Sequence, residues 1–231
     1  MTKTLLLPTP LPMPRFMTDY SPPEGPLRII HNDEHVVLVD KPTGLLSVPG
    51  KPAEHGDCVL SRVEVQFPGA QLIHRLDLET SGMMIFAMNA RAQRIINRQF
   101  EQRLVHKVYV ALVDGRPRED EGVIDLPLTG DWPRRPLQKV CFETGKPART
   151  RWRAIGHGEG WTRLRLWPET GRTHQLRVHL KEIGHPILGD PFYAPDPVYD
   201  AATRLMLHAT RLMLRHPGSG RRRDWRMRAP F

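Results

Sequence analysis

Short apolar runs separated by polar turns fill most of the chain from residue 27 onward. Short runs bounded by turn residues are typical of strands, so we expect strands at 27–30, 36–39 and 83–87. In two other stretches, 59–67 and 90–102, apolar residues recur every three or four positions, which predicts helices. Asn89 stands in the position of a helix cap before the second of them.

The second half of the chain repeats the strand pattern more densely. Alternation at 107–113 predicts a strand with Lys107 and Tyr109 on one face. Further strands are expected at 122–126, 139–142, 149–154 and 161–167, a helix at 173–183, and a less regular apolar segment at 205–215. Because strands outnumber helices and come largely in hairpin order, we expect an α+β fold with a mixed, mostly antiparallel sheet and flanking helices.

The two ends of the chain differ from its middle in composition. Residues 1–25 are proline-rich and aperiodic, which predicts a disordered tail. Residues 26–217 are expected to form one catalytic domain without an internal repeat. Residues 218–231 carry an arginine cluster and are expected to form a basic C-terminal tail that attracts RNA without sequence preference.

Charge narrows the classes of partner. The chain has 231 residues, 39% of them hydrophobic, a net charge of +9 and a sequence pI of about 10.1. This composition is typical of a globular protein that binds a polyanion, although nucleic-acid enzymes and simple binders share it. We expect no membrane partner, because no apolar run approaches the roughly 20 residues that a spanning helix needs.

The N-terminus and the cysteines bear on the cell compartment. Leu5, Leu6 and Leu7 are followed by alternating prolines, which prevent a signal-peptide apolar region. Cys58 and Cys141 lie far apart and outside any Cys-x-x-Cys pattern, so a zinc ribbon, a disulfide framework or a dithiol redox site has no support. We therefore expect a cytoplasmic protein.

A polar segment at 74–82, His-Arg-Leu-Asp-Leu-Glu-Thr-Ser-Gly, stands between two apolar runs. If those runs are strands, Arg75 and Asp77 lie at a sheet edge that a substrate can reach. An ordinary turn, in which Asp77 caps the amides of Thr80 and Ser81, fits the same spacing. The pattern alone leaves both readings open.

A second polar segment, at 170–179, carries arginines and histidines at helical spacing. Arg177 follows Thr173 by four residues, so both can share one side of a helix; a solvated basic face is the alternative. His174, His179 and His185 lack a His-Glu-x-x-His pattern and a nearby acidic ligand, so we expect no metal site.

These segments resemble the motifs of the RluA family of pseudouridine synthases. The likeness covers residues from about 27 to 215 and includes 41–42, 44–50, 74–82, 107–111, 126–148, 170–179 and 185–190. It implies the pseudouridine synthase fold, with a central cleft. It also implies a catalytic set, Asp77, Tyr109 and Arg177, and a substrate-binding set, Arg75, His74, Lys41, Thr80, Lys107 and Leu176.

The resemblance assigns roles within the catalytic set. Asp77 is implied as the catalytic carboxylate, either a nucleophile at C1′ or a base at the 2′ position, and Arg177 as its ion-pair partner. Tyr109 is implied to lie against the uracil and to take the C5 proton. Arg75 is the expected side chain to fill the space that the extruded base leaves.

The implied reaction converts a loop uridine of RNA to pseudouridine by base flipping, cleavage of the glycosidic bond and reattachment through C5. The implied partners are a tRNA anticodon stem-loop and a 23S rRNA hairpin. We expect no DNA partner, no cofactor and a monomer. Arg134, Arg135, Lys139 and Lys146 are expected either to grip the phosphate backbone or to form a solvated face.

Three other functions fit part of the pattern. The chain could be a synthase restricted to ribosomal RNA, or an RNA-binding module without activity, since charge alone fits both. A glycoside hydrolase with Asp77 and Glu79 as its carboxylate pair ranks lower, because the two residues alternate along one short segment and should diverge.

Overall fold

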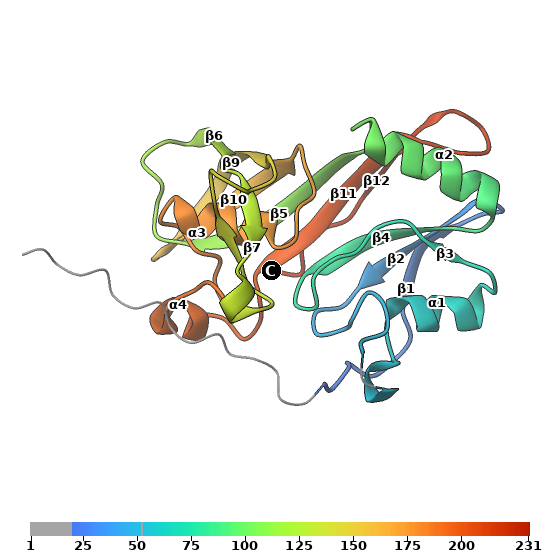
Figure 1. Ribbon diagram of the computed structural model, residues 1–231, viewed down its shortest axis with the longest axis horizontal. Helices are drawn as coiled ribbons and strands as arrows, with labels where there is room; N and C mark the ends of the chain where they lie inside the picture. Colours follow the sequence, from blue (N-terminus) through green and yellow to red (C-terminus); the bar gives the residue numbers. More distant parts are fainter. Residues whose placement is uncertain (1–19, 52) are drawn as a thin grey trace, which may run out of the picture.

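The computed structural model describes residues 20–51 and 53–231, and within them twelve strands form two sheets (Figure 1). The strands of the large sheet follow the order β1-β2-β4-β11-β5-β10-β9-β6, with β12 beside β11 and β3 beside β4. β7 and β8 form a separate pair. All pairings are antiparallel except that of β4 with β11, so the expected α+β fold with a mixed, mostly antiparallel sheet is confirmed.

The first half of the chain follows the apolar pattern closely. Its elements are β1 (Arg28–Asn32), β2 (Val36–Lys41), a 3-10 turn (Ala53–His55), α1 (Val59–Gln66), β3 (Gln71–Leu72), β4 (Ser81–Ala87) and α2 (Ala90–Glu101). The expected cap is present, because the Asn89 side chain accepts a hydrogen bond from the amide of Ala92 at 2.9 Å.

The second half adds short elements that the sequence pattern did not indicate. Its elements are β5 (His106–Asp114), β6 (Glu121–Asp125), β7 (Leu128–Gly130), a 3-10 turn (Trp132–Arg134), β8 (Gln138–Val140), β9 (Arg149–Gly158), β10 (Trp161–Pro168), α3 (Gln175–Glu182), α4 (Asp196–Asp200), β11 (Leu207–Arg215) and β12 (Arg222–Arg226). Of these, β7, α4 and β12 were not expected.

The structure bears differently on the two segments that were predicted to be tails. The segment 218–231 is not a tail along its whole length, because β12 lies within it and pairs with β11 from Arg211↔Arg226 to Arg215↔Arg222. At the other end, residues 1–19 lie outside the described part of the chain. Tyr20 belongs to the fold: its hydroxyl donates to the Asp57 carbonyl at 2.8 Å and accepts from the Leu46 amide at 3.0 Å.

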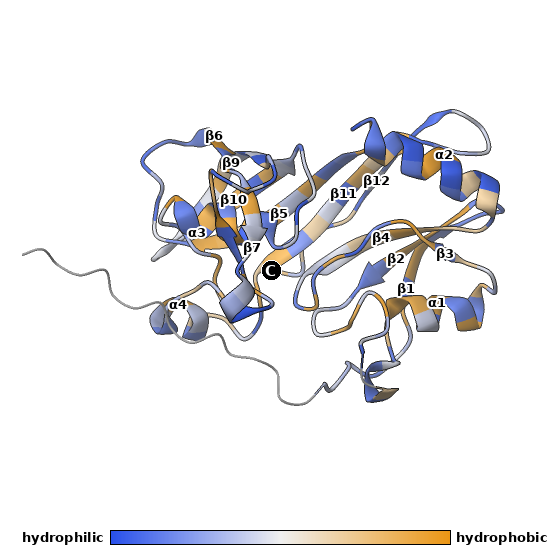
Figure 2. Ribbon diagram, in the orientation of Figure 1, coloured by the Kyte–Doolittle hydropathy of each residue, from blue (hydrophilic) through white to orange (hydrophobic). Residues whose placement is uncertain are grey.

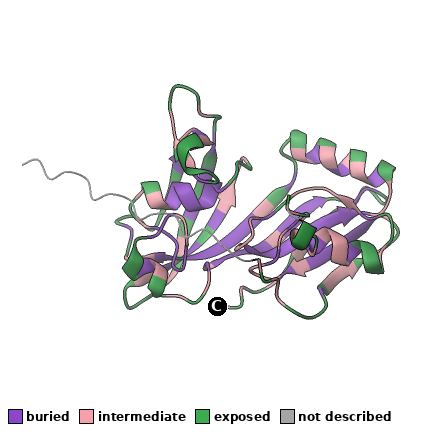
Figure 3. Ribbon diagram, turned by 60° about the horizontal axis from the view of Figure 1, so that its bottom comes forward, coloured by how far each residue is buried: buried purple, intermediate pink, exposed green. Residues whose placement is uncertain are grey.

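Helices cover the sheet in two places. α1 and α3 pack on one face, where their apolar residues join those of β2, β4, β5 and β10 in the largest buried cluster. α2 packs between β4 and β11, where these strands diverge, and its outer side is polar (Figures 1 and 2). Figure 3 shows that the buried strands run through both halves of the molecule. In the part of the chain that the structure describes, no helix is long and apolar enough to cross a bilayer.

β4 and β11 join the two halves of the sheet over a very short distance. Their parallel pairing consists of His208↔Ser81 and Ala209↔Gly82. Gly82 has φ +114, and a Cβ at this position would lie 2.5 Å from both the nitrogen and the oxygen of Ala209. Only glycine fits here, which explains the Gly that ends the 74–82 segment.

Candidate active site

Asp77 lies in the loop that connects β3 to β4, directly before the junction with β11. The hydroxyl of Ser47 fixes this loop: it donates to the Leu76 carbonyl at 2.6 Å and accepts from the Leu76 amide at 3.1 Å. The backbone carbonyl of Asp77 accepts from the Thr80 amide at 3.1 Å. The Asp77 carboxylate faces Arg177 instead of capping the turn, so the ordinary-turn reading does not describe this side chain.

Lys41 supports the same loop from beneath. Its ammonium is fully buried and donates to the carbonyls of Leu78, Thr80 and Pro42 at 2.7, 2.8 and 2.9 Å. Burial lowers the pKa of Lys41 to about 7. The Lys41 side chain thus holds the loop and does not line the cavity. The resemblance had implied that Lys41 contacts the substrate, and the structure does not place it there.

Arg177 enters the site from the first turns of α3. The loop before this helix is closed by Gln175, whose side-chain oxygen accepts from the Thr170 hydroxyl at 2.7 Å and the Arg172 amide at 3.0 Å. The helix begins at Gln175, so Thr173 lies in the loop and not on the helix, although it also lines the cavity.

The guanidinium of Arg177 connects two carboxylates. Its Nε and Nη2 donate to Asp190 at 2.8 and 2.7 Å, and its Nη1 lies 3.6 Å from Asp77 Oδ2. Both Arg177 and Asp190 are buried. The arginine therefore reaches Asp77 already fixed in orientation, with its positive charge beside that carboxylate.

His174 completes the surroundings of Asp77. It has left-handed backbone (φ 52), and its Nε2 lies 4.0 Å from Asp77 Oδ1. Its Nδ1 lies 2.7 Å from the hydroxyl of Tyr193. Burial lowers the pKa of His174 to about 4, so the ring is neutral at pH 7 and acts as a polar wall beside the carboxylate.

β5 supplies the opposite side of the site. Lys107 and Tyr109 share one face of the strand, as the alternation predicted, and both line the cavity, as the resemblance implied. Burial, and then the negative charge of Asp77, raise the pKa of Tyr109, so its hydroxyl is protonated at neutral pH. Burial lowers the pKa of Lys107, whose ammonium lies 5.8 Å from the centre of the Phe100 ring.

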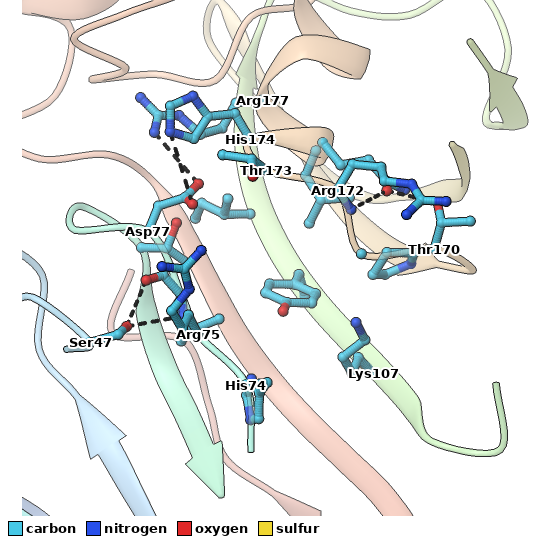
Figure 4. A pocket seen from close by; sticks show the side chains of 18 of the residues that line it. Ser47, His74, Arg75, Asp77, Lys107, Thr170, Arg172, Thr173, His174 and Arg177 are labelled. Carbon is cyan, nitrogen blue, oxygen red and sulfur yellow. Dashed lines mark hydrogen bonds and ion pairs between the residues drawn. The ribbon is translucent and has the colours of Figure 1, made fainter. Parts of the chain in front are cut away.

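These elements enclose a cavity of about 890 Å³, and Asp77 points across it toward Arg177 and His174 (Figure 4). Eight of the nine residues implied by the resemblance line it: His74, Arg75, Asp77, Thr80, Lys107, Tyr109, Leu176 and Arg177. Lys41 is the exception. The fold thus brings together residues from the β3–β4 loop, β5 and α3, which are far apart in the chain.

The remaining residues that line the cavity differ in their exposure and hydrogen bonding. Burial lowers the pKa of His74 to about 3; its Nε2 accepts from the Ile85 amide at 3.2 Å and its ring stacks on Phe100. Arg75 is exposed at the rim, beside Asp77 (Figure 4). The hydroxyl of Thr80 is buried and has no hydrogen-bond partner among the described residues.

The three histidines considered as metal ligands each bond to different partners. His174 bonds to Tyr193, His179 to Thr150 and the Leu126 carbonyl, and His185 to the Asp114 carbonyl. Over residues 20–51 and 53–231, the structure contains no group of three side chains placed to hold a metal ion.

Sequence reasoning missed the residues that position the catalytic set. Asp190 and Ser47 lie within segments that resemble the family, but the sequence pattern predicts no role for either. Tyr193 was not singled out. The signal for Asp190 was its buried context, an aspartate after an apolar run, but no spacing rule connects it with an arginine thirteen positions earlier.

Comparison with known proteins identifies the family. A family model described as RNA pseudouridylate synthase matches residues 35–182. The chain belongs to the RNA pseudouridylate synthase family. Its expected function as an RNA pseudouridine synthase, an isomerase, is thereby confirmed at the level of the family.

Curated members of the RNA pseudouridylate synthase family resemble the chain over most of its length. A protein of Vibrio vulnificus named dual-specificity RNA pseudouridine synthase RluA is 50% identical over 209 residues, covering 88% of this chain and 84% of its own. The protein of the same name from Escherichia coli K12 is 48% identical over 217 residues, covering 93% and 99%.

Solved structures of the family agree with the fold. Human RNA pseudouridylate synthase domain containing 1 superposes with a TM-score of 0.76 at 28% identity, covering 91% of this chain and 87% of its own. Human RNA pseudouridylate synthase domain containing 4 gives 0.72 at 24% identity, covering 88% of each chain, and supports the fold alone.

Proposed function

We propose that this chain isomerises a loop uridine of RNA to pseudouridine, with Asp77 acting at the ribose. The observation that carries the proposal is the Asp77 carboxylate in the cavity, 3.6 Å from a guanidinium that Asp190 fixes. A carboxylate can work as a nucleophile or a base, and the guanidinium beside Asp77 orients it for that role.

Two routes start from this carboxylate. Asp77 can attack C1′ and form a glycosyl ester as the bond from C1′ to uracil N1 breaks, or it can remove the 2′ proton and release the uracil by elimination. In both routes the free uracil turns within the cavity and C5 joins C1′. This step breaks the ester bond to Asp77 in the first route and returns the proton from Asp77 to C2′ in the second. The cavity of about 890 Å³ is large enough to retain the base during this turn.

The proton balance suggests a role for Tyr109. During the isomerisation N1 gains a proton and C5 loses one. The raised pKa keeps the Tyr109 hydroxyl protonated beforehand and makes its phenolate a stronger base. In our proposal the hydroxyl gives its proton to N1 as the glycosidic bond breaks and N1 takes the electron pair of that bond. The resulting phenolate can then take the proton from C5, which restores the tyrosine for the next cycle.

Substrate entry requires the target base to leave its stack. Unstacked RNA bases bind to aromatic and arginine planes. Trp132 is 69% exposed and Phe142 77%, both in the segment around β7 and β8, and the Arg135 guanidinium lies 3.2 Å from the Trp132 ring centre. Pro136 of the same segment lines the cavity, so this surface continues into the site.

We propose two RNA substrates, a tRNA anticodon stem-loop and a 23S rRNA hairpin. The name dual-specificity RNA pseudouridine synthase, carried by the two curated relatives, supports more than one substrate, and the sequence resemblance implies these two. A monomer in the cytoplasm that acts without a cofactor remains our expectation.

Release of tritium from uridine C5 tests the function. The chain is incubated with unmodified tRNA and, separately, with a 23S rRNA hairpin, each labelled at C5, and Asp77→Asn is run beside it. We expect release from both RNAs by the parent and none by the variant. Release from the rRNA hairpin alone would favour the rRNA-restricted synthase, whereas RNA binding without release from either would favour an inactive binding module.

The structure gives the alternative of a glycoside hydrolase no second carboxylate in the cavity. Glu79 does not line the cavity with Asp77, and its backbone carbonyl accepts from the Thr43 hydroxyl at 2.7 Å. A pair of carboxylates flanking one bond is the arrangement that glycoside hydrolysis requires.

A further inference from the structure

A second cavity, of about 500 Å³, lies on the face of the large sheet opposite to the active site. Val108 and Val110 of β5 line it, whereas the intervening Tyr109 lines the active site. Successive side chains of a strand point to opposite faces, so the two cavities are separated by the thickness of the sheet. We call the second cavity the arginine groove.

The arginine groove is strongly basic. The residues that line it include no Asp or Glu and five arginines, namely Arg163, Arg165, Arg211, Arg226 and Arg228. One nearby acid, Asp224, bonds both Arg211 and Arg226, at 2.7 and 2.6 Å. The other three arginines have no ion pair among the described residues.

Arginines on the neighbouring strand β9, in contrast, do have carboxylate partners. On β9, each of Arg149, Arg151 and Arg153 lies within 3.6 Å of a carboxylate. On the adjacent β10, Arg163 and Arg165 have no such partner within residues 20–51 and 53–231. Like charges gathered around a groove repel one another, and an anion bound between them would remove that cost.

The shape and the lining of the arginine groove favour RNA backbone as that anion. Guanidinium groups bind phosphate through paired hydrogen bonds. Half-buried Trp167 adds an aromatic surface on which a base can stack, beside the apolar floor of Val108 and Val110. An acidic peptide would use the charges but has no bases for the aromatic surface.

We propose that the arginine groove is a second RNA-binding site, which takes the ribose–phosphate backbone of a strand outside the target loop. The proposal rests on RNA being the substrate. The backbone can belong to a distant part of the RNA in the active site or to a second RNA molecule. In both cases the groove contributes to RNA affinity without touching the reacting base.

The test compares two double variants with the same change of charge. Arg163→Gln/Arg165→Gln removes two groove charges, and Arg116→Gln/Arg118→Gln removes two exposed charges from the loop after β5, outside the groove. Both are made in the Asp77→Asn background so that binding is measured without turnover. The probes are unmodified tRNA and a hairpin holding only its anticodon stem-loop, titrated over a range of salt concentrations.

We expect the groove variant to lose about tenfold in tRNA affinity, with a salt slope smaller by about 1.4 to 1.8, because two phosphate contacts are lost and each contributes about 0.7 to 0.9. The control variant should keep the parent slope. Arg163→Lys/Arg165→Lys should restore the slope, because it keeps the charges. An effect seen with tRNA alone would assign the groove to a distant part of the same RNA. A fall in bound hairpins per protein from two to one would assign it to a second molecule.

Equal affinities and slopes for the groove and control variants, with both RNAs, would overturn the proposal. The result is independent of the test of function. Loss of groove binding is read from titrations, whereas the proposed reaction is read from tritium release by the parent chain, so either can fail while the other stands.

Discussion

Asp190 holds Arg177 through both carboxylate oxygens, at 2.8 and 2.7 Å, and leaves the third guanidinium nitrogen 3.6 Å from Asp77. The nearer carboxylate is wholly buried, and the farther one opens onto the cavity. The two hydrogen bonds to Asp190 therefore fix the orientation of Arg177, and its remaining nitrogen faces the carboxylate of Asp77. In this arrangement Asp190 is a positioning residue for the reaction.

Asp190→Asn is expected to lower the rate of tritium release at saturating RNA at least tenfold, because Arg177 loses its bidentate partner. The fold should lose about 3 kcal/mol, as is usual when one member of a buried ion pair is removed. RNA affinity should change little, and this split between rate and affinity distinguishes positioning from binding. Glu121→Gln, which breaks the exposed pair with Arg153, is the control and should change neither quantity measurably.

Tyr109→Phe removes the proposed proton carrier and leaves the ring in place. Single-turnover tritium release should slow about 100-fold or more, within the range for a lost general acid–base group, while RNA affinity stays near that of the parent. Near-normal release would remove Tyr109 from the proton transfer and leave it as an aromatic contact to the uracil.

Gly82→Ala should unfold or severely destabilise the protein, by about 3 kcal/mol or more, because the new methyl group would meet the Ala209 backbone at 2.5 Å. Gly160→Ala is a matched control: Gly160 also has positive φ (+74), but no atom lies within 4 Å of the added carbon. It should cost only about 1 to 2 kcal/mol of backbone strain. Equal losses in urea unfolding would contradict the close approach at the β4–β11 junction.

Lys41→Met fills the buried space but leaves three carbonyl oxygens without their donor. We expect a loss of roughly 2 to 4 kcal/mol in the free energy of unfolding, together with slower tritium release, because the loop carrying Asp77 loses its support. The exposed Lys51→Met should change stability by no more than about 0.5 kcal/mol. A stable, fully active Lys41→Met protein would contradict the supporting role.

Acid should weaken the fold through its buried histidines. Burial lowers the pKa of His208 to about 4 from an ordinary 6.5, so the unfolded chain takes up the proton first as the pH falls. Stability contributed by the neutral ring is complete above pH 6.5 and is lost between pH 6.5 and 4, at up to about 1.4 kcal/mol per pH unit. His74 and His174 contribute in the same direction.

Urea unfolding of His208→Gln at pH 7.5 and 5.0 checks this assignment. His208 lies behind the site, where its Nδ1 is 2.7 Å from the Ser81 hydroxyl, so the variant keeps the reacting groups. Between the two pH values it should lose about 1 to 2 kcal/mol less than the parent does. Identical losses would show that His208 does not titrate in this window.

The sequence pattern predicted the long elements well because their signals are local. The α2 helix shows a polar cap followed by apolar residues at helical spacing, and β5 alternates over nearly its whole length. The same pattern could not indicate β12, whose residues Arg222–Arg226 are mostly charged and pair only because β11 offers a free edge. β7 and α4 are too short, at three and five residues, to show a period.

The sequence was enough to predict which residues form the candidate site, but not how most of them are held in place. Asp77, Tyr109 and Arg177 come from segments that resemble family motifs, and the structure brings them to one cavity. Their catalytic roles stay predictions. Lys41 was assigned to the substrate because its Lys-Pro segment resembles a family motif, whereas the structure buries its ammonium against the carbonyls of Pro42, Leu78 and Thr80.

The place of β11 between β4 and β5 has a consequence for the order of synthesis. Asp77 precedes β4 and Tyr109 lies on β5, yet these strands do not pair with each other; both pair with residues 207–213. A nascent chain that has emerged through Arg177 carries every catalytic residue but not the strand that brings them together. We therefore expect the site to assemble only after β11 has left the ribosome.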